Sequence, residues 1–146
     1  MQLIDFLKTA DKDEYIYLGA ASCYLWISKP EEMIEKLPEL DENHTAELQH
    51  KIEDKNRHIA FYEKHLASAK SEFEVKELKH NLEKVQRIKN DLVAKLENRI
   101  PFAARQVKDV YRRRMVKPFG ICVIIEGHEF GDFWSIEDME ENNVNL

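Results

Sequence analysis

The segment between Arg99 and Pro118 gathers the side chains that are best suited to binding an anion. Seven cationic residues lie in it: Arg99, Arg105, Lys108, Arg112, Arg113, Arg114 and Lys117. Asp109 is the one carboxylate among them, so the segment carries +6 and the rest of the chain −12 of the net charge of −6. A cationic patch on an acidic protein attracts a small anion, while the protein as a whole repels long polyanions and anionic surfaces. We therefore expect no DNA or RNA polymer and no membrane as partner.

Arginine and aromatic side chains occur together in this segment. The planar guanidinium group of arginine can give two parallel hydrogen bonds to one phosphate. Phe102 and Tyr111 flank the basic residues, and an aromatic ring can stack on the flat face of a base. The combination predicts a site for a planar, phosphate-bearing ligand. The same residues also allow a solvated basic turn whose charges pair with acidic helix faces.

The six histidines and the scattered carboxylates form no metal-binding or catalytic motif. His58 and His65 are seven residues apart, whereas metal-binding pairs on a helix prefer i, i+4 spacing and need a third ligand. His128 stands near Glu126 and Glu129 and could take part in acid–base chemistry, but no nucleophile stands beside it. We therefore expect no metal, no cofactor and no catalytic residue, and a protein that is not an enzyme.

Residues 41–99 form one long stretch without glycine or proline, and Pro101 follows it. Its apolar residues recur at three- and four-residue steps, which predicts helix. They form two seams: Leu48, Ile52, Ile59, Tyr62, Leu66, Ala69 and Phe73 in the first, and Leu78, Leu82, Val85, Leu92 and Leu96 in the second. A five-residue step puts the seams out of phase, and Ser71 with Glu74 reads as a capping box between them. We predict an antiparallel hairpin with arms of about 26 residues, roughly 40 Å long, whose seams are core or a dimer interface.

Four short runs outside this stretch predict β-strands, because they are rich in aromatic and β-branched residues. They are Tyr15–Leu18, Ser22–Ile27, Val107–Tyr111 and Phe119–Glu126. The last run is nearly all apolar, as in a strand that is buried on both faces. Short helices are predicted near Leu3–Leu7 and from Pro30 onward, with Leu37 and Pro38 closing the second.

The fold class that follows is α+β: a small, mostly antiparallel sheet with a long inserted antiparallel helical hairpin. At 146 residues the chain is expected to be a single domain. Residues 1–40 and 100–146 would form its α+β body, and residues 41–99 the inserted hairpin. Phe133 and Trp134 would pack back onto the sheet, and Ser135 would cap a last helical turn.

The cysteines and the chain start favour a reducing compartment. Cys23 and Cys122 stand singly in apolar runs, which is typical of buried thiols rather than of disulfides or a zinc site. The N-terminus lacks the basic and apolar segments of a signal peptide, and no apolar run approaches about 18 residues. These features predict a soluble, cytosolic protein.

Two spaced motifs carry a resemblance to a known family. They read Phe102-x-x-Arg105-x-Val107-x-x-x-Tyr111 and Ile124-Ile125-Glu126-Gly127-x-Glu129-x-Gly131-x-Phe133-Trp134. The arrangement resembles a group of small phage proteins that includes the Thoeris anti-defence sponges. The likeness covers the last 45 residues best, the N-terminal strand pair loosely and the helical hairpin in architecture only.

The resemblance implies a non-enzymatic function in the host cytoplasm. Such proteins combine a small sheet with long helices and assemble as dimers or higher oligomers. They sequester cyclic ADP-ribose-type signals made by bacterial immune systems, and some also bind cyclic oligonucleotides. The expected partners are therefore a cyclic nucleotide second messenger and further copies of the chain, which would associate through the helical hairpin.

The resemblance also implies a set of ligand-binding residues: Phe102, Arg105, Tyr111, Arg112, Arg113, Glu129 and Trp134. According to the resemblance, Phe102 would stack on the base, while Arg105 and Arg112 would contact phosphates. Tyr111 and the turn from Glu129 to Trp134 complete the wall. The run of three arginines at 112–114 departs from the family's simpler pattern, which leaves the phosphate-contacting arginine open.

Two other readings remain open from the residues. The charge of −12 outside the basic segment would suit an acidic helical hairpin that inhibits a host protein by direct binding or mimics nucleic acid. A phage structural or assembly protein is the third reading, and it predicts that the chain is present in purified particles.

Overall fold

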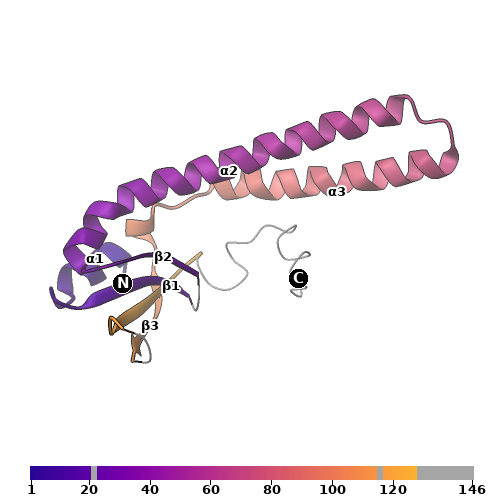
Figure 1. The fold of residues 1–146 in the computed structure, drawn as a ribbon. Coiled ribbons are helices and arrows are strands. Elements are labelled where there is room, and N and C mark those ends of the chain that lie inside the picture. The colour runs from indigo at the N-terminus through magenta and orange to yellow at the C-terminus, as the bar shows by residue number, and fades with distance from the viewer. Residues whose placement is uncertain (21–22, 115–116, 128–146) are drawn as a thin grey trace. The chain divides into compact units, whose positions relative to one another are not determined.

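The computed structural model describes residues 1–20, 23–114 and 117–127. The helices and strands follow one another as α1 (Leu3–Thr9), β1 (Tyr15–Ala20), β2 (Cys23–Ser28), α2 (Pro30–Ala67), α3 (Glu72–Glu97), η1 (Phe102–Ala104), β3 (Val107–Arg113) and β4 (Gly120–Ile125) (Figure 1). The chain is therefore α+β, as the sequence predicts. The predicted packing of Phe133 and Trp134 and the helical turn after Ser135 lie outside the described residues.

The four strands form one mixed sheet in the order β2-β1-β4-β3. Two antiparallel pairs, β1 with β2 and β3 with β4, meet through a parallel pairing of β1 with β4. The central β1 and β4 approach so closely that a Cβ atom on Gly120 would collide with the carbonyl oxygen of Tyr15. A glycine at the start of β4 is therefore needed for this pairing.

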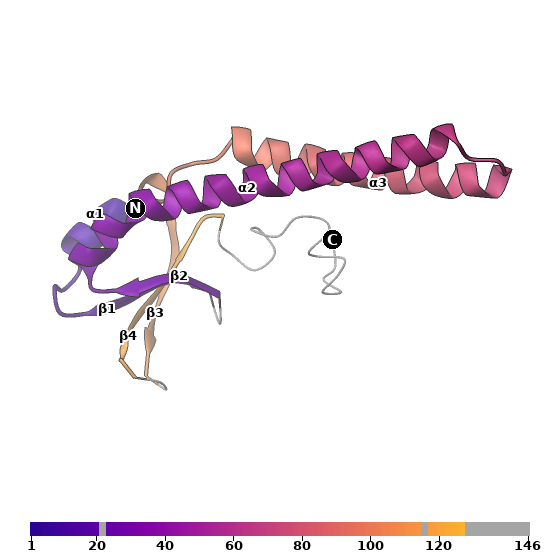
Figure 2. The same cartoon turned by 45° about the horizontal axis from the view of Figure 1, so that its top comes forward.

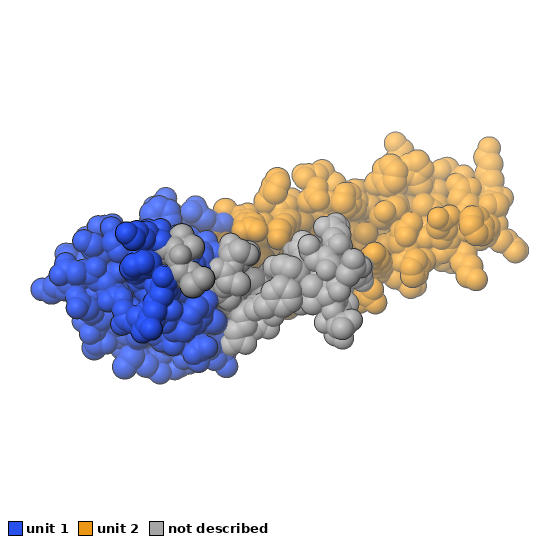
Figure 3. Space-filling view, turned by 60° about the horizontal axis from the view of Figure 1, so that its bottom comes forward, with its two compact units in different colours: residues 1–43, 100–134 blue, residues 44–99, 135–146 orange. Residues whose placement is uncertain are grey.

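The chain divides into two compact units (Figure 3). Among the described residues, 1–43 and 100–127 make up the first unit, and 44–99 make up the second. The first holds the sheet, α1, η1 and the start of α2. The second holds the remainder of α2 together with α3.

The core of the first unit lies on one face of the sheet, under α1 and the start of α2 (Figure 2). Its buried residues are Leu3, Leu7, Ile16, Leu18, Met33, Leu37, Leu40, Phe102, Val123 and Ile125. Ile16 and Leu18 alternate along β1, and Val123 and Ile125 along β4, as expected where one face of each strand points into a core. The opposite face of the sheet carries the intervening side chains.

Helix α2 differs from the prediction that Pro38 ends a short helix, because it continues through this residue from Pro30 to Ala67. A proline inside a helix removes one backbone hydrogen bond and is disfavoured. The helix persists because Met33, Leu37 and Leu40 recur at helical spacing and are all buried in the core. Helix α2 therefore has 38 residues, of which those from 44 onward belong to the second unit with the 26 residues of α3.

The turn of the hairpin lies where the capping box predicts it. The hydroxyl of Ser71 accepts a hydrogen bond of 3.1 Å from the backbone N–H of Glu74. The Glu74 carboxylate accepts from the N–H of Lys70 rather than from that of Ser71. Phe73 was placed in the first apolar seam, but it lies in the first turn of α3 and is 77% exposed.

The two helices of the second unit are packed together by a small apolar cluster. Leu48 on α2 is buried with Ile88 and Leu92 on α3, and Ile52 and Leu96 pack against them. None of the described helices is long and apolar enough to cross a membrane.

Candidate anion-binding site

Phe102, the residue predicted to stack on a base, is part of the core. Its side chain is 0% exposed, and its backbone N–H donates a 3.0 Å hydrogen bond to the Asp41 carboxylate. The short η1 helix that follows Pro101 directs the ring inward. A ring without exposed surface cannot stack on a ligand in this conformation, so Phe102 is a core residue here.

Arg105 is also buried, at 7% exposure. Its Nε donates to the carbonyl oxygen of Ile100 at 2.8 Å, and Nη1 donates to that of Glu126 at 3.4 Å. Its guanidinium carbon lies 4.4 Å from the centre of the Phe102 ring. Arg105 therefore links the segment before β3 to the end of β4 by hydrogen bonds. Its role in this structure is to stabilise the fold.

The remaining predicted residues of the described chain lie together on β3. Tyr111 pairs with Cys122, which in turn pairs with Tyr17 on β1. Since directly paired residues share a face of the sheet, Tyr111 points away from the core, and so does Arg113 two residues on. Arg112 points to the other face, where its Nη1 donates to the Glu14 carboxylate at 2.9 Å. Glu129 and Trp134 lie outside the described residues.

Arg113 lies against two tyrosine rings that the sequence patterns did not indicate as site residues. Its guanidinium carbon is 4.7 Å from the centre of the Tyr17 ring and 5.4 Å from that of Tyr24. Its Nη1 donates a 2.7 Å hydrogen bond to the hydroxyl of Tyr24. The two rings meet edge to face at 5.3 Å, and the Tyr17 hydroxyl donates to the carbonyl oxygen of Pro118. We call Tyr17, Tyr24 and Arg113 the tyrosine–arginine cluster.

An irregularity in the β1–β2 pairing brings Tyr24 into this cluster. Leu18 pairs with Trp26, but the next residue, Gly19, pairs with Tyr24, so Leu25 is an extra residue in β2. Such a bulge reverses the alternation of side chains. Leu25 therefore packs against the core, and Tyr24 lies on the face of Tyr17. Gly19 adopts a φ of 134°, a conformation that residues with a side chain rarely take.

The Nε of Arg113 is the unusual atom of the cluster. It is buried, and it has no hydrogen-bond partner among the residues that the structure describes. A buried donor without a partner costs about 1–3 kcal/mol, so such an atom calls for an explanation. Because Nε is buried, an anion could contact it only if neighbouring side chains moved aside.

Tyr24 remains protonated at neutral pH. Burial, followed by its hydrogen bond to Cys122, raises its pKa from 10.0 to about 12, although the nearby Arg113 acts in the opposite direction. The hydroxyl lies 3.7 Å from the Cys122 sulfur. Tyr24 therefore serves as a neutral hydrogen-bonding group that orients Arg113, not as a base.

Further cations surround the cluster at the same end of the sheet. Arg114 and Lys117 are exposed, and the Lys117 ammonium lies 5.9 Å from the centre of the Phe119 ring. Phe119 and Tyr111 are both exposed aromatic residues. The connection between β3 and β4 therefore offers positive charge and flat apolar surface together.

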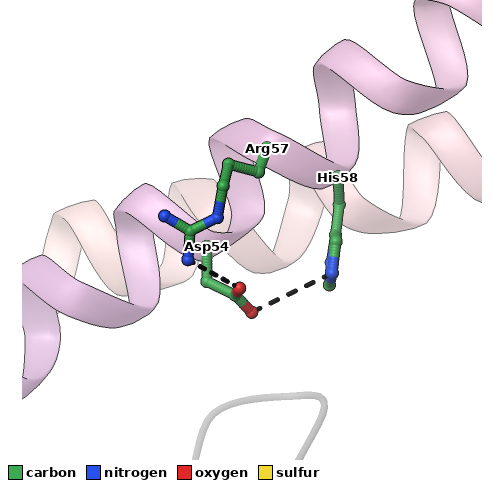
Figure 4. Close-up of polar contacts among 3 residues, drawn as sticks. All are labelled: Asp54, Arg57 and His58. Atoms are coloured by element: carbon green, nitrogen blue, oxygen red, sulfur yellow. Dashed lines mark hydrogen bonds and ion pairs between the residues drawn. The ribbon is translucent and has the colours of Figure 1, made fainter.

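His58, one of the histidines considered as a metal ligand, lies on α2 in a polar group with Asp54 and Arg57. The Asp54 carboxylate accepts a 3.0 Å hydrogen bond from Arg57 and lies 4.0 Å from the His58 ring nitrogen (Figure 4). The hydrogen bond from Arg57 lowers the pKa of Asp54. Among the described residues, no group of three or more His, Cys, Asp or Glu side chains could hold a metal ion.

Sequence patterns missed Tyr17, Tyr24 and Cys122 because these residues read as ordinary strand residues. Tyr17 and Tyr24 lie about 90 to 100 positions from Arg113, and only the pairing of the strands joins them to it. Comparisons with protein-family models, curated proteins and solved structures give no match.

Proposed function

We propose that the protein binds a small phosphate-bearing nucleotide at the end of the sheet where the tyrosine–arginine cluster lies. It holds this nucleotide without cleaving or otherwise modifying it. The resemblance to the Thoeris anti-defence sponges favours a cyclic nucleotide immune signal, of the glycocyclic ADP-ribose type or a cyclic oligonucleotide. In this proposal the protein is a phage-encoded sponge that acts in the host cytoplasm.

The orientation of Arg113 is the observation that carries the proposal. Contacts with the Tyr17 and Tyr24 rings and the hydrogen bond from Nη1 hold the guanidinium in one orientation. The Nε atom is buried and has no partner in the described residues, so a phosphate would bind it after neighbouring side chains move aside. An oriented guanidinium edge matches two oxygens of a phosphate, and little side-chain entropy is lost when they bind.

The surrounding side chains suit the remainder of a nucleotide. Arg114 and Lys117 add positive charge that would attract an anion to this end of the sheet. Arg112 points to the other face of the sheet, where it pairs with Glu14, and is not part of this site. Because Phe102 is buried, the stacking role passes to the exposed Tyr111 and Phe119.

Calorimetric titration with glycocyclic ADP-ribose, followed by heating of the complex, tests the proposal directly. We expect saturable binding and recovery of the intact ligand from the heated sample. A cleaved product would contradict a sponge, and absence of binding to cyclic ADP-ribose, glycocyclic ADP-ribose and cyclic dinucleotides would contradict nucleotide binding.

The first variant prediction concerns Arg113→Lys, which keeps the charge but removes the planar edge. We expect the dissociation constant for the nucleotide to rise about tenfold or more, since hydrogen bonds to charged groups contribute about 1.5–3 kcal/mol. Arg57→Lys, at an exposed arginine on α2, is the matched control and should leave the affinity unchanged. Equal affinity of the Arg113→Lys variant and the wild type would show that the ligand binds elsewhere.

A further inference from the structure

Strand β3 forms one edge of the sheet. Within residues 1–20, 23–114 and 117–127, its partner strand is β4, which pairs with its inner side. Residues 108–112 are all exposed. The edge of a sheet carries backbone N–H and C=O groups that can pair with another extended chain. The outer side of β3 is therefore a candidate surface for the addition of a strand.

The start of this edge already pairs with another part of the chain. Gln2 forms an antiparallel bridge with Gln106. The backbone N–H of Val107 donates to the carbonyl oxygen of Met1 at 2.8 Å. Met1 and Gln2 therefore lie antiparallel to the residues that lead into β3. The edge beyond Val107, residues 108–113, continues in the same line and suits a short antiparallel segment.

Two apolar side chains of β3 would gain cover from such a segment. Val110 pairs with Val123, which is fully buried in the core, so Val110 lies on the core face of the sheet. It is nevertheless 41% exposed. Tyr111 lies on the opposite face and is also 41% exposed. Apolar residues placed opposite these two would extend the core on one face and cover the tyrosine ring on the other.

The charge of the edge determines the chemistry of the segment that fits it. Cations outnumber carboxylates along β3 and just after it: Lys108, Arg112, Arg113, Arg114 and Lys117 against Asp109 and against Glu14, which pairs with Arg112. At the start of the edge, the Met1 ammonium and the backbone N–H of Glu126 both donate to Gln106, so one charge of each sign stands there. A second copy of β3 laid antiparallel on this edge would bring the two sets of cations together, which is destabilising. The charge therefore favours an acidic segment over a second copy.

We propose that the outer edge of β3 binds an extended acidic peptide segment by antiparallel strand addition. This binding is independent of the nucleotide proposed above. Peptide residues opposite Arg113 and Arg112 are carboxylates in this arrangement. Those opposite Tyr111 and Val110 are apolar, and the residue opposite Asp109 is a cation. Backbone hydrogen bonds hold the peptide, and the charges select its sequence.

Fluorescence anisotropy with labelled synthetic peptides tests the proposal on the full chain, without nucleotide. The probe contains the sequence Glu-Glu-Ile-Val-Lys, and a charge-reversed control contains Lys-Lys-Ile-Val-Glu. We expect saturable binding of the probe, about tenfold or more tighter than that of the control. N-methylation of the probe's backbone should abolish binding, because it removes the donors that pair with the edge. A dissociation constant of the probe above about 1 mM, or equal affinity of the methylated probe, would overturn the proposal.

A charge exchange at Arg112 tests the location of the peptide. Arg112→Glu should weaken the probe about tenfold and strengthen a peptide with Glu-Lys-Ile-Val-Lys, whose lysine lies opposite residue 112. Arg57→Glu, at an exposed arginine of the second unit, is the matched control and should change neither affinity. Circular dichroism checks the fold of each variant, because Arg112 also pairs with Glu14.

Val110→Thr is a second variant that keeps the charge and the β-branched shape. It should weaken both peptides several-fold, because it removes apolar contact on the core face. An Arg112→Glu variant with the peptide preference of the wild type, or an unchanged affinity in Val110→Thr, would show that acidic peptides bind elsewhere.

Discussion

At the scale of single residues, the raised pKa of Tyr24 leads to a prediction that an alkaline titration can test. Its pKa is raised to about 12 from 10.0, so the folded chain retains this proton at a pH at which the unfolded chain has lost it. The resulting stabilisation is complete below about pH 10 and disappears as the pH rises through 12. In an alkaline titration followed by tyrosinate absorbance, we expect one of the five tyrosines to ionise late.

Two substitutions assign that late ionisation. Tyr24→Phe should remove it, while Arg113→Gln should delay it further, because the nearby positive charge lowers the pKa of Tyr24. Loss of the late step in a Tyr111→Phe variant instead would show that the assignment to Tyr24 is wrong.

Because Phe102 is buried, its substitution is expected to lower the stability of the protein. The ring is fully buried in the first unit, so Phe102→Ala should lower the free energy of unfolding by about 3–5 kcal/mol. Denaturant titration measures this loss, and Phe119→Ala, at an exposed ring, should cost far less. Similar stabilities for the two variants would contradict the core position of Phe102. Lost ligand binding in Phe102→Ala would therefore report on folding, not on stacking.

At the scale of elements, the passage of α2 through Pro38 is the least expected feature. Pro38→Ala restores an N–H to the helix interior, and proline there is about 3 kcal/mol less favourable than alanine. We expect the substitution to stabilise the protein against denaturant by an amount up to that figure. Pro30→Ala, at the first position of the same helix, should give little gain. An unchanged stability in Pro38→Ala would mean that the helix is interrupted at this residue.

The bulge in β2 links local backbone geometry to the candidate site. It places Tyr24 beside Tyr17 and turns Leu25 toward the core. A regular strand would keep Tyr24 on the face of Trp26, and Arg113 would then lack its hydrogen-bond partner. One additional residue in a strand therefore decides whether the cluster exists.

At the scale of the whole molecule, ligand binding is proposed for the first unit, on the face of the sheet opposite its core. Substitutions at exposed residues of the second unit, such as Arg57→Lys, should therefore leave the affinity for the nucleotide unchanged. Calorimetric titration of this variant and the wild type measures the effect.

The local elements could be predicted because their causes lie within a few residues. Ser71 and Glu74 are three positions apart, and their capping contact marks the start of α3 in the sequence and in the structure alike. The strand character of β3 and β4 likewise follows from their own side chains. The basic character of the segment from Arg99 to Pro118 was also evident from composition alone.

Only the tertiary structure decided which of these residues are available to a ligand. Phe102 and Arg105 look like exposed binding residues in sequence, yet η1 and the end of β4 bury them. Arg113 meets Tyr17 and Tyr24 through strand pairings that join positions about 90 or more residues apart. Such contacts depend on the register of the sheet and on one bulge, and no short stretch of sequence specifies either of them.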